Sequence, residues 1–219
     1  MTDDERELPS YDHEAVGEAL AGVEGERRVV GVLLAGGTSS RFGEANKLLA
    51  ELDGESLLRH ATRTLFDAGL PDVVAVLGYE AEAVASALDG LDVRIVRNPD
   101  YEEGLSTSVA RGVEAARDAG ADAALFLPGD MPAVDPATVT LLADAYRAGL
   151  GTALAAAYGG RRGNPVLFDA AHFDALLAVE GDTGGRSVLL GSDDGALVET
   201  GDPGVVEDVD TTGDLRRRQ

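Results

Sequence analysis

The sequence predicts a three-layer α/β domain in which helices cover both faces of a mainly parallel β-sheet. Short apolar runs typical of buried strands recur along the chain, stretches with helical spacing separate them, and Pro, Gly or Asp residues bound each run. Repeated strand–helix–strand units of this kind form parallel sheets. The chain has 219 residues, 44% of them hydrophobic, which is enough to bury the core of one domain.

The first strand is expected at residues 29–34, and apolar residues at helical spacing predict a helix over 56–68. Further strands are expected at 73–77, 93–96 and 123–127, each pair separated by a helical stretch. Sheets of this type bind ligands at the carboxyl ends of their strands. Polar residues that directly follow a strand are therefore the first candidates for a functional site.

Residues 1–28 are expected to form an acidic arm or helix appended to a domain that spans 29–219. A short apolar stripe at helical spacing lies between residues 15 and 20. The N-terminus is acidic, and the chain has no run of eighteen apolar residues, so neither a targeting segment nor a membrane span is expected. We therefore expect a cytoplasmic protein.

The chain is strongly acidic, with 40 acidic and 18 basic residues and a net charge of −22. Such a surface repels the phosphates of nucleic acids and anionic lipids, so neither is an expected partner. An acidic excess with almost no lysine is typical of a halophilic protein, because concentrated salt screens the repulsion. Since the chain has no cysteine, a metal must use oxygen or histidine ligands, and Mg²⁺ is the expected cation.

The strongest candidate for a binding site is the loop LAGGTSSRFGEANK at residues 34–47, directly after the first predicted strand. Its glycines let backbone N–H groups approach phosphate oxygens, its serines add hydroxyl donors, and Arg41 and Lys47 supply positive charge. Lys47 is the only lysine in the chain. The residues expected to bind a nucleoside triphosphate here are Leu34, Ala35, Gly36, Gly37, Ser39, Ser40, Arg41 and Lys47.

The alternative interpretation of this loop is a plain turn with a solvated arginine and lysine. The loop matches neither the G-x-x-x-x-G-K-[ST] motif of P-loops nor the G-x-G-x-x-G motif of dinucleotide-binding folds. Neither of those two sites is therefore predicted.

A second polar cluster, residues 129–132, follows the strand at 123–127 and is expected at the same sheet edge as the loop. Asp130 in this cluster is the candidate ligand for Mg²⁺, which typically takes one or two carboxylates together with phosphate oxygens and water. An Asp that caps the following turn is the alternative.

Five segments of the chain resemble the nucleotidyltransferases that attach a nucleotide to the molybdenum cofactor, in particular the cytidylyltransferase branch. They are LAGGTSSRFGEANKLLAELDGESLLRH at 34–60, NPDYEEGLSTSVARGVEAA at 98–116, LFLPGDMPAVDPATV at 125–139, RRGNPVLFDAAHFDALLAVEGDTGGRSVLL at 161–190 and VEDVDTTGDL at 206–215. The resemblance implies a Rossmann-like fold of glycosyltransferase-A type, a nucleoside triphosphate substrate and Mg²⁺.

The resemblance also implies roles for residues outside the glycine-rich loop. Asp210 is a candidate second metal ligand, with an ordinary surface carboxylate as the alternative. Asn98, Ser106 and Ser108 are expected at the nucleotide, although Ser106 or Ser108 could instead cap a helix that begins near residue 107. The residues expected to meet the acceptor are Arg162, Asn164, Asp182 and Arg186, with surface ion pairs or loop positions as the alternative.

The expected reaction is attack by an acceptor phosphate on the α-phosphorus of a nucleoside triphosphate, with pyrophosphate leaving. Lys47, Arg41 and Asp130 are the expected catalytic residues. Transfer of CMP to molybdopterin is favoured, but residues 34–37 depart from the cytidylyltransferase form towards that of guanylyltransferases, so GMP stays open. The alternatives are a sugar-1-phosphate acceptor, or a non-catalytic nucleotide-binding factor for the maturation of a molybdoenzyme.

Overall fold

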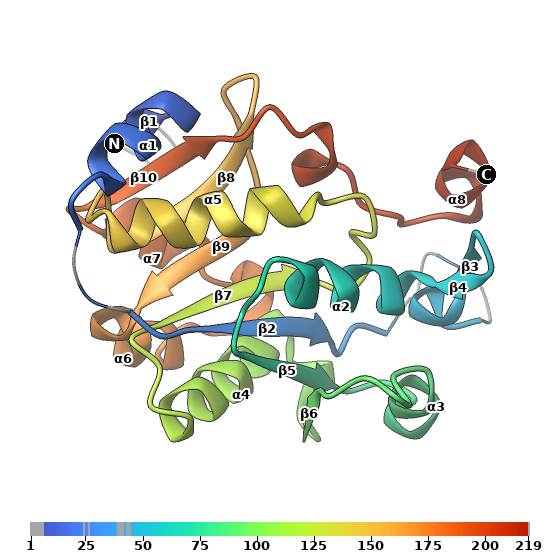
Figure 1. Cartoon of the computed structure of the whole chain (residues 1–219). Helices are drawn as coiled ribbons and strands as arrows, with labels where there is room; N and C mark the ends of the chain where they lie inside the picture. The colour runs from blue at the N-terminus through green and yellow to red at the C-terminus, as the bar shows by residue number, and fades with distance from the viewer. Residues whose placement is uncertain (1–6, 24, 26, 39–41, 43–44, 219) are drawn as a thin grey trace.

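The computed structural model describes residues 7–218 apart from 24, 26, 39–41, 43 and 44 (Figure 1). These residues form α-helices, β-strands and short 3-10 helices, labelled η. In chain order they are β1 (Ser10–Tyr11), α1 (His13–Leu20), β2 (Val29–Ala35), η1 (Lys47–Leu49), β3 (Glu51–Leu52), β4 (Glu55–Ser56), α2 (Leu57–Asp67), β5 (Asp72–Leu77), α3 (Ala81–Ser86), β6 (Arg94–Arg97), η2 (Tyr101–Glu103), α4 (Leu105–Asp118), β7 (Ala123–Pro128), α5 (Pro136–Arg147), β8 (Ala153–Tyr158), β9 (Arg161–Asp169), η3 (Ala170–His172), α6 (Phe173–Leu177), η4 (Gly181–Thr183), α7 (Arg186–Gly191), β10 (Gly195–Glu199), η5 (Pro203–Val206) and α8 (Thr212–Arg218).

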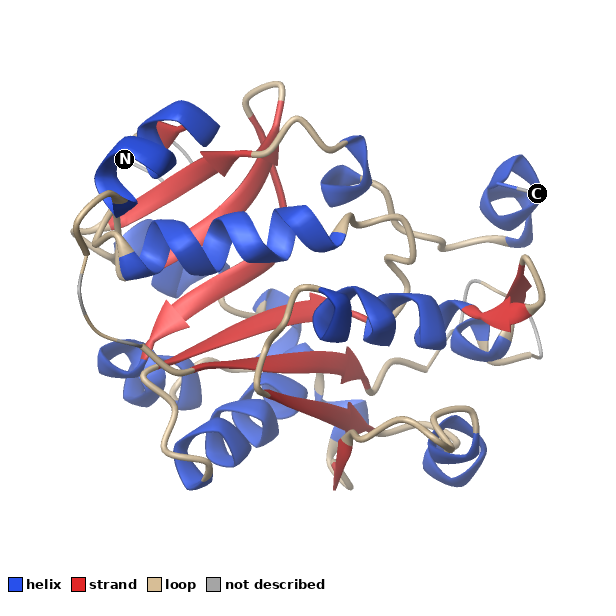
Figure 2. Ribbon diagram, in the orientation of Figure 1, coloured by secondary structure: helices blue, strands red, loops and turns tan. Residues whose placement is uncertain are grey.

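Eight of the described strands form one sheet, in the order β1, β10, β8, β9, β7, β2, β5, β6. Neighbouring strands run parallel, except that β9 is antiparallel to both β7 and β8. Helices lie in front of and behind the sheet (Figure 2). The predicted three-layer fold is therefore confirmed, and the four predicted strands correspond to β2, β5, β6 and β7.

The side chains of β2 alternate between the two faces of the sheet. Val29 and Leu33 belong to a buried cluster with residues of α2 and α5, whereas Val30 and Val32 belong to a second cluster with residues of α4, α6 and α7. All four are fully buried. A parallel strand that is covered on both faces carries an apolar residue at nearly every position, which explains the uninterrupted run VVGVLLA.

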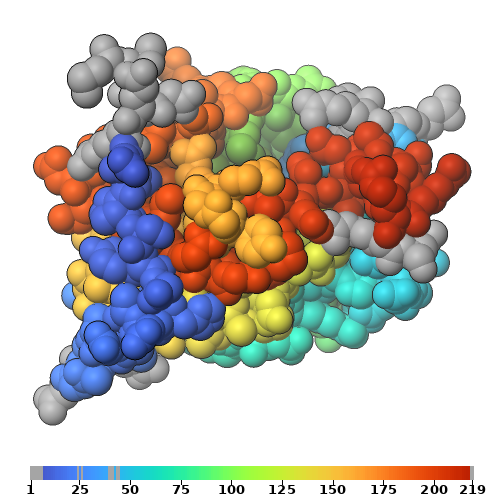
Figure 3. All heavy atoms as spheres, turned by 90° about the horizontal axis from the view of Figure 1, so that it is seen from above, coloured from blue at the N-terminus to red at the C-terminus, as the bar shows by residue number. Residues whose placement is uncertain are grey.

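The N-terminal segment docks on the edge of this sheet. β1 pairs parallel with β10, and Val16 on α1 is only 2% exposed, in the same cluster as residues of α5. In Figure 3 the segment, in blue, lies against yellow and orange parts of the later chain. The structure thus has a helix where the apolar stripe of residues 15–20 suggested one. The domain boundary at residue 29 stays a prediction.

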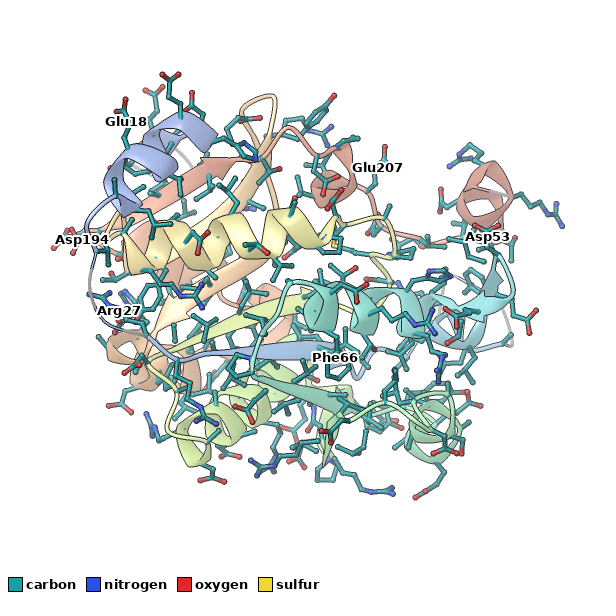
Figure 4. All side chains as sticks on the ribbon, in the orientation of Figure 1. Glu18, Arg27, Asp53, Phe66, Asp194 and Glu207 are labelled. Atoms are coloured by element: carbon teal, nitrogen blue, oxygen red, sulfur yellow. The ribbon has the colours of Figure 1, made fainter. Side chains whose placement is uncertain are left out.

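Acidic side chains lie exposed on several sides of the molecule. Figure 4 places Glu18 and Asp194 on one side and Asp53 and Glu207 towards the other, and all four are exposed. The negative charge is therefore spread over the surface, and the cleft described below is not its only location. Within the described part of the chain, no helix has the length and apolar character needed to cross a bilayer.

Tyr146 joins α5 to the sheet through a buried hydroxyl. Its side chain is 1% exposed, and its Oη lies 2.7 Å from Asp169 Oδ2 and 3.0 Å from the carbonyl oxygen of Asp122. Burial raises the pKa of the Tyr146 phenol above its ordinary value, and the Asp169 carboxylate raises it further. The folded protein therefore favours the neutral phenol.

We predict that alkaline pH weakens the fold through Tyr146. Because its pKa is raised in the folded state, its contribution is complete below the unfolded pKa of about 10 and is lost as the pH rises above that value. Tyr146→Phe should lower the free energy of unfolding near neutral pH by about 1–2 kcal/mol. It should also flatten the decline of that free energy at alkaline pH.

Urea unfolding measured from neutral to alkaline pH tests both effects. The chain has no cysteine, and the other side chains with ordinary pKa values in this range are one lysine and four further tyrosines, so the comparison with a second tyrosine variant is essential. Tyr158→Phe is the matched control, because Tyr158 is 40% exposed. The same alkaline decline in wild type and Tyr146→Phe would contradict the prediction.

Candidate active site

The carboxyl ends of β2, β5 and β7 meet at one edge of the sheet (Figure 1). The backbone N–H of Gly129 donates to the carbonyl of Leu34 over 2.9 Å, and the N–H of Tyr79 donates to the carbonyl of Gly36 over 3.4 Å. These bonds bring together the turns that follow the three strands. The prediction that residues 34–47 and 129–132 reach the same edge is therefore confirmed for the described residues.

A cleft of about 550 Å³ opens at this edge. Its polar end contains the turn Gly36, Gly37 and Thr38, which we call the glycine turn, together with Lys47, Asp130 and Asp208. A second group of lining residues, which we call the apolar end, consists of Leu105, Val109, Phe126, Val166 and Phe168, and Gly184 and Gly185 pack near it. A single cleft thus offers a charged region and an apolar region side by side.

Gly36 is required by close packing at the floor of the polar end. A Cβ atom on Gly36 would lie 2.5 Å from Ser108 Oγ, and a Cβ on the neighbouring Gly78 would lie 2.6 Å from the Gly36 carbonyl oxygen. Ser108 is itself 3% exposed and cannot move aside easily. The turn after β2 is therefore held directly against the turn after β5 and the first turn of α4.

We predict that Gly36→Ala is destabilising and Gly37→Ala is not. The added methyl group at Gly36 meets Ser108 Oγ, whereas a Cβ at Gly37 has no heavy atom within 4 Å. Overpacking of this kind costs about 1–3 kcal/mol. Thermal and urea unfolding of the two variants measure the difference. Equal stability of Gly36→Ala and Gly37→Ala would show that the floor of the cleft is not closely packed.

Three carboxylates gather at the polar end, and we call Asp130, Asp208 and Asp210 the carboxylate cluster. One oxygen of each lies within 4.8 Å of the others. The N–H of Val209 donates to the carbonyl of Asp130 over 3.0 Å, and the buried Val209 side chain packs with Leu52. Because successive side chains of extended chain point to opposite sides, Asp208 and Asp210 are directed away from that apolar contact.

Lys47 contacts the carboxylate cluster. Its Nζ lies 2.5 Å from Asp130 Oδ2 and 2.8 Å from Asp210 Oδ1. Burial lowers the pKa of the Lys47 ammonium, but the attraction of Asp130 and Asp210 outweighs burial, so the pKa lies above its ordinary value. Partial burial and the charges of Asp210 and Asp130 raise the pKa of the Asp208 carboxyl. Lys47 is thus a charged group held by acidic residues.

The structure brings together the two residues predicted to bind metal, Asp130 and Asp210, from segments 80 residues apart in the sequence. Sequence reasoning missed Asp208. The available signal was the alternation in the segment Asp208-Val209-Asp210, in which an apolar residue between two acidic residues of extended chain places both carboxylates on one side.

The predicted triphosphate-binding residues fall into three groups. Ser39, Ser40 and Arg41 lie outside the described residues. Leu34, Gly36, Gly37 and Lys47 line the cleft together with Thr38, which was not predicted. Ala35 is 1% exposed and lies behind the wall of the cleft.

The structure does not support the alternative in which Ser106 or Ser108 caps a helix that begins near residue 107. The helix begins at Leu105, and Gly104 is its N-cap residue, with φ of 117°. The carboxylate Oδ1 of Asp182 accepts a hydrogen bond from the Leu105 N–H over 3.3 Å. The sequence around α4 could not indicate this acceptor, because it comes from a segment far along the chain.

Asn98 and Ser108 support each other beside the cleft. The side-chain amide of Asn98, which is 2% exposed, donates to Thr107 Oγ1 over 2.9 Å and to Ser108 Oγ over 3.0 Å. Ser108 lines the cleft, whereas Asn98 and Ser106 are buried and are not among its lining residues. Asn98 therefore positions the serine that contacts the glycine turn.

Two of the four predicted acceptor residues reach the cleft. Asn164 on β9 and Asp182 on η4 line it, whereas Arg162 on β9 and Arg186 at the start of α7 are not among its lining residues. Asp182 belongs to the segment 181–185, whose Gly184 and Gly185 also line the cleft. This segment covers the apolar end and is attached to α4 through the Asp182–Leu105 hydrogen bond.

The model of the MobA-like NTP transferase domain matches residues 31–196. The chain belongs to this family. The matched region contains the glycine turn, Lys47, Asp130 and the segment 181–185, whereas Asp208 and Asp210 follow it. Membership supports nucleotidyl transfer as the class of activity.

Solved structures share the fold of this MobA-like chain. A nucleotidyl transferase from Methanothermobacter is 29% identical, with a TM-score of 0.75, over 88% of this chain and 96% of that chain. The complex of Rv0371c from Mycobacterium tuberculosis with manganese is 29% identical, with a TM-score of 0.69, over 87% of this chain and 97% of that chain.

The curated relatives carry names of different kinds. Nicotine blue oxidoreductase of Paenarthrobacter nicotinovorans is 34% identical over 86% of this chain and 95% of that protein. The bifunctional protein GlmU of Sinorhizobium medicae is 35% identical over 57% of this chain, but the match spans only 27% of that longer protein. The chain is thus similar to proteins whose names denote different chemistry.

Proposed function

We propose that this MobA-like protein is a Mg²⁺-dependent nucleotidyltransferase that transfers CMP, or alternatively GMP, from a nucleoside triphosphate to the phosphate of a molybdopterin-type acceptor. Pyrophosphate is released, and the product would pass to a molybdoenzyme. The observation that carries the proposal is the carboxylate cluster with Lys47, which shares the polar end of the cleft with the glycine turn.

The carboxylate cluster fits a hard divalent cation. Its three oxygens lie within 4.8 Å of one another, and the ammonium of Lys47 contacts two of the three carboxylates. Carboxylate oxygens are ligands that suit Mg²⁺ or Mn²⁺. The similar Rv0371c structure is a complex with manganese. When bound, such an ion neutralises charge on phosphate oxygens as a leaving group departs.

The residues of the polar end would bind and orient the triphosphate. The glycine turn can present backbone N–H groups to phosphate oxygens, and Lys47 adds a positive charge on a flexible stem. An oxygen of the acceptor phosphate forms a bond to the α-phosphorus, while the bond between the α-phosphorus and the bridging oxygen of pyrophosphate breaks. An ionised phosphate is already a nucleophile, so the reaction requires no general base.

The apolar end supports a planar heterocyclic acceptor in preference to a sugar phosphate. Leu105 and Val166 line it together with the largely buried Phe126 and Phe168, and the polar side chains that line the cleft include Tyr101, Glu102, Ser108, Asn164 and Asp182. A sugar ring has hydroxyl groups all around it, each of which needs a hydrogen-bond partner when buried. A pterin has apolar faces and a polar edge, which matches this arrangement.

We predict that Asp130→Asn and Lys47→Ala each lower pyrophosphate release by at least about 100-fold, because each removes charge that organises the phosphates. Asp118→Asn is the matched control. Asp118 ends α4 away from the cleft, and its exposed carboxylate lies 3.6 Å from Arg94. Release is measured with CTP, Mg²⁺ and molybdopterin, from dilute to concentrated salt. Near-normal turnover in either site variant would refute the assigned roles.

We predict that the protein releases pyrophosphate with molybdopterin as acceptor and not with sugar 1-phosphates. CTP, GTP, ATP and UTP are each combined with molybdopterin or with sugar 1-phosphates, and pyrophosphate is measured. The expected result is release with molybdopterin and CTP, or GTP in its place. Release with sugar 1-phosphates alone would show that the acceptor is a sugar phosphate and not molybdopterin. Tight nucleotide binding without release from any acceptor would favour a non-catalytic nucleotide-binding factor.

Oxidoreduction is a second candidate function, favoured by the match to nicotine blue oxidoreductase over most of both chains. The same cleft could then hold a dinucleotide hydride donor and a planar dye, with the apolar end against the dye. Oxidation of NADH or NADPH in the presence of quinoid dyes tests this candidate. Dye reduction that persists in Asp130→Asn, without pyrophosphate release from any triphosphate, would establish it over nucleotidyl transfer.

A further inference from the structure

We infer that Lys47 is a built-in competitor of the divalent cation: its ammonium occupies the carboxylate cluster until the triphosphate draws it away, so that nucleotide and cation bind as a coupled pair. This inference rests on the proposed function, because it concerns the same cation and the same nucleotide. It assigns to Lys47 two successive partners, the carboxylates first and the phosphates second.

The position of the Lys47 ammonium is the first argument. Its Nζ is 2.5 Å from Asp130 and 2.8 Å from Asp210, two of the three residues whose oxygens lie within 4.8 Å of one another. A divalent ion held by these oxygens would therefore lie beside a positive charge. In a site where the Lys47 and Asp130 side chains are only 15% and 18% exposed, water screens that repulsion poorly.

The chemistry of the side chain is the second argument. The chain has 18 lysine and arginine residues, and Lys47 is the only lysine among them. A lysine is a compact charge on a flexible four-carbon stem, whereas an arginine forms a rigid planar fork that binds a carboxylate with two hydrogen bonds. Lysine therefore suits a group that has to exchange one anion for another.

The second partner of Lys47 lies within the same cleft. Lys47 begins η1, and Leu48, the next residue, is 4% exposed and anchors this short helix. The backbone of Lys47 is thus fixed while its side chain lies in the cleft that the glycine turn also lines. A triphosphate on the glycine turn would offer oxygens to the ammonium, and the released carboxylates would be left to the cation.

The inference is tested by binding of Mn²⁺ to the full chain without nucleotide, measured by calorimetry at constant ionic strength. Lys47→Met should bind Mn²⁺ at least about tenfold more tightly than wild type, because the competing charge is gone. Lys47→Gln should behave in the same way, and Lys47→Arg should bind Mn²⁺ no more tightly than wild type. Arg94→Met is the control, because it changes the net charge equally at an exposed site.

The coupling is measured with a CTP analogue whose α,β-bridge cannot be cleaved. In wild type the analogue should tighten Mn²⁺ binding by more than it does in Lys47→Met, since part of the gain comes from withdrawing the ammonium. Circular dichroism confirms that each variant is folded. Equal or weaker Mn²⁺ binding by folded Lys47→Met and Lys47→Gln than by wild type would overturn the inference.

The outcomes also separate this inference from the proposed function. If wild type with the analogue binds Mn²⁺, and Lys47→Met without it binds no more tightly than wild type, the competition is absent and the cation site stands. If no variant binds Mn²⁺ with or without the analogue, both the inference and the metal-dependent reaction fail. Asp130→Asn, which removes one ligand, should weaken Mn²⁺ binding in either background.

Discussion

The candidate site depends on the parallel pairing of β2 with β5 on one side and β7 on the other. Backbone hydrogen bonds fix these strands in register, with Leu34 opposite both Val76 and Pro128. Parallel strands that end together must also release their following turns together, so Gly36, Gly78 and Asp130 meet at one edge. No local attraction between these turns is needed, because the sheet determines where each one begins.

The sheet determines where the turns begin, and the charges of Lys47 and the three carboxylates determine how these side chains interact there. In a chain with a net charge of −22, gathering three of its carboxylates at one place is unfavourable, since like charges repel. The carboxylate cluster is tolerated because Lys47 lies among its members and because the backbone bond from Val209 to Asp130 holds the two segments together. Removing or displacing Lys47 takes a positive charge away from Asp130 and Asp210, which strengthens their attraction for a divalent cation.

Sequence patterns predicted those parts of the fold that depend on neighbouring residues. The apolar runs of β2, β5, β6 and β7 and the spacing of α2 are local features, and each was found in place. β8 and β10 were not anticipated. The sequence of β8, ALAAAY, is rich in alanine, which favours helices, but its first five residues are fully buried between two layers, and tertiary packing decides the conformation.

Within the candidate site, too, sequence patterns predicted local features and not contacts between distant segments. The glycine turn and Asp130 follow strands and could be found one segment at a time, whereas the Asp182–Leu105 cap joins residues 77 apart and the Lys47–Asp210 contact joins residues 163 apart. A pattern in one segment cannot name a partner in another. For the same reason the sequence assigned Lys47 to phosphate, its expected chemical partner, and the fold revealed the carboxylates that hold it first.

The cleft offers a physical reason why this chain is similar to proteins with names as different as nucleotidyl transferase and oxidoreductase. The strands β2 and β7 fix the polar end, and the glycine turn there suits phosphate groups of many nucleotides. Phe126 of the apolar end belongs to β7, whereas Leu105 and Val109 come from α4, Val166 and Phe168 from β9, and Gly184 and Gly185 from the segment 181–185. Substitutions in α4, β9 and the segment 181–185 can therefore change this part of the cleft while β2 and β7, and with them the positions of the glycine turn and Asp130, stay in register.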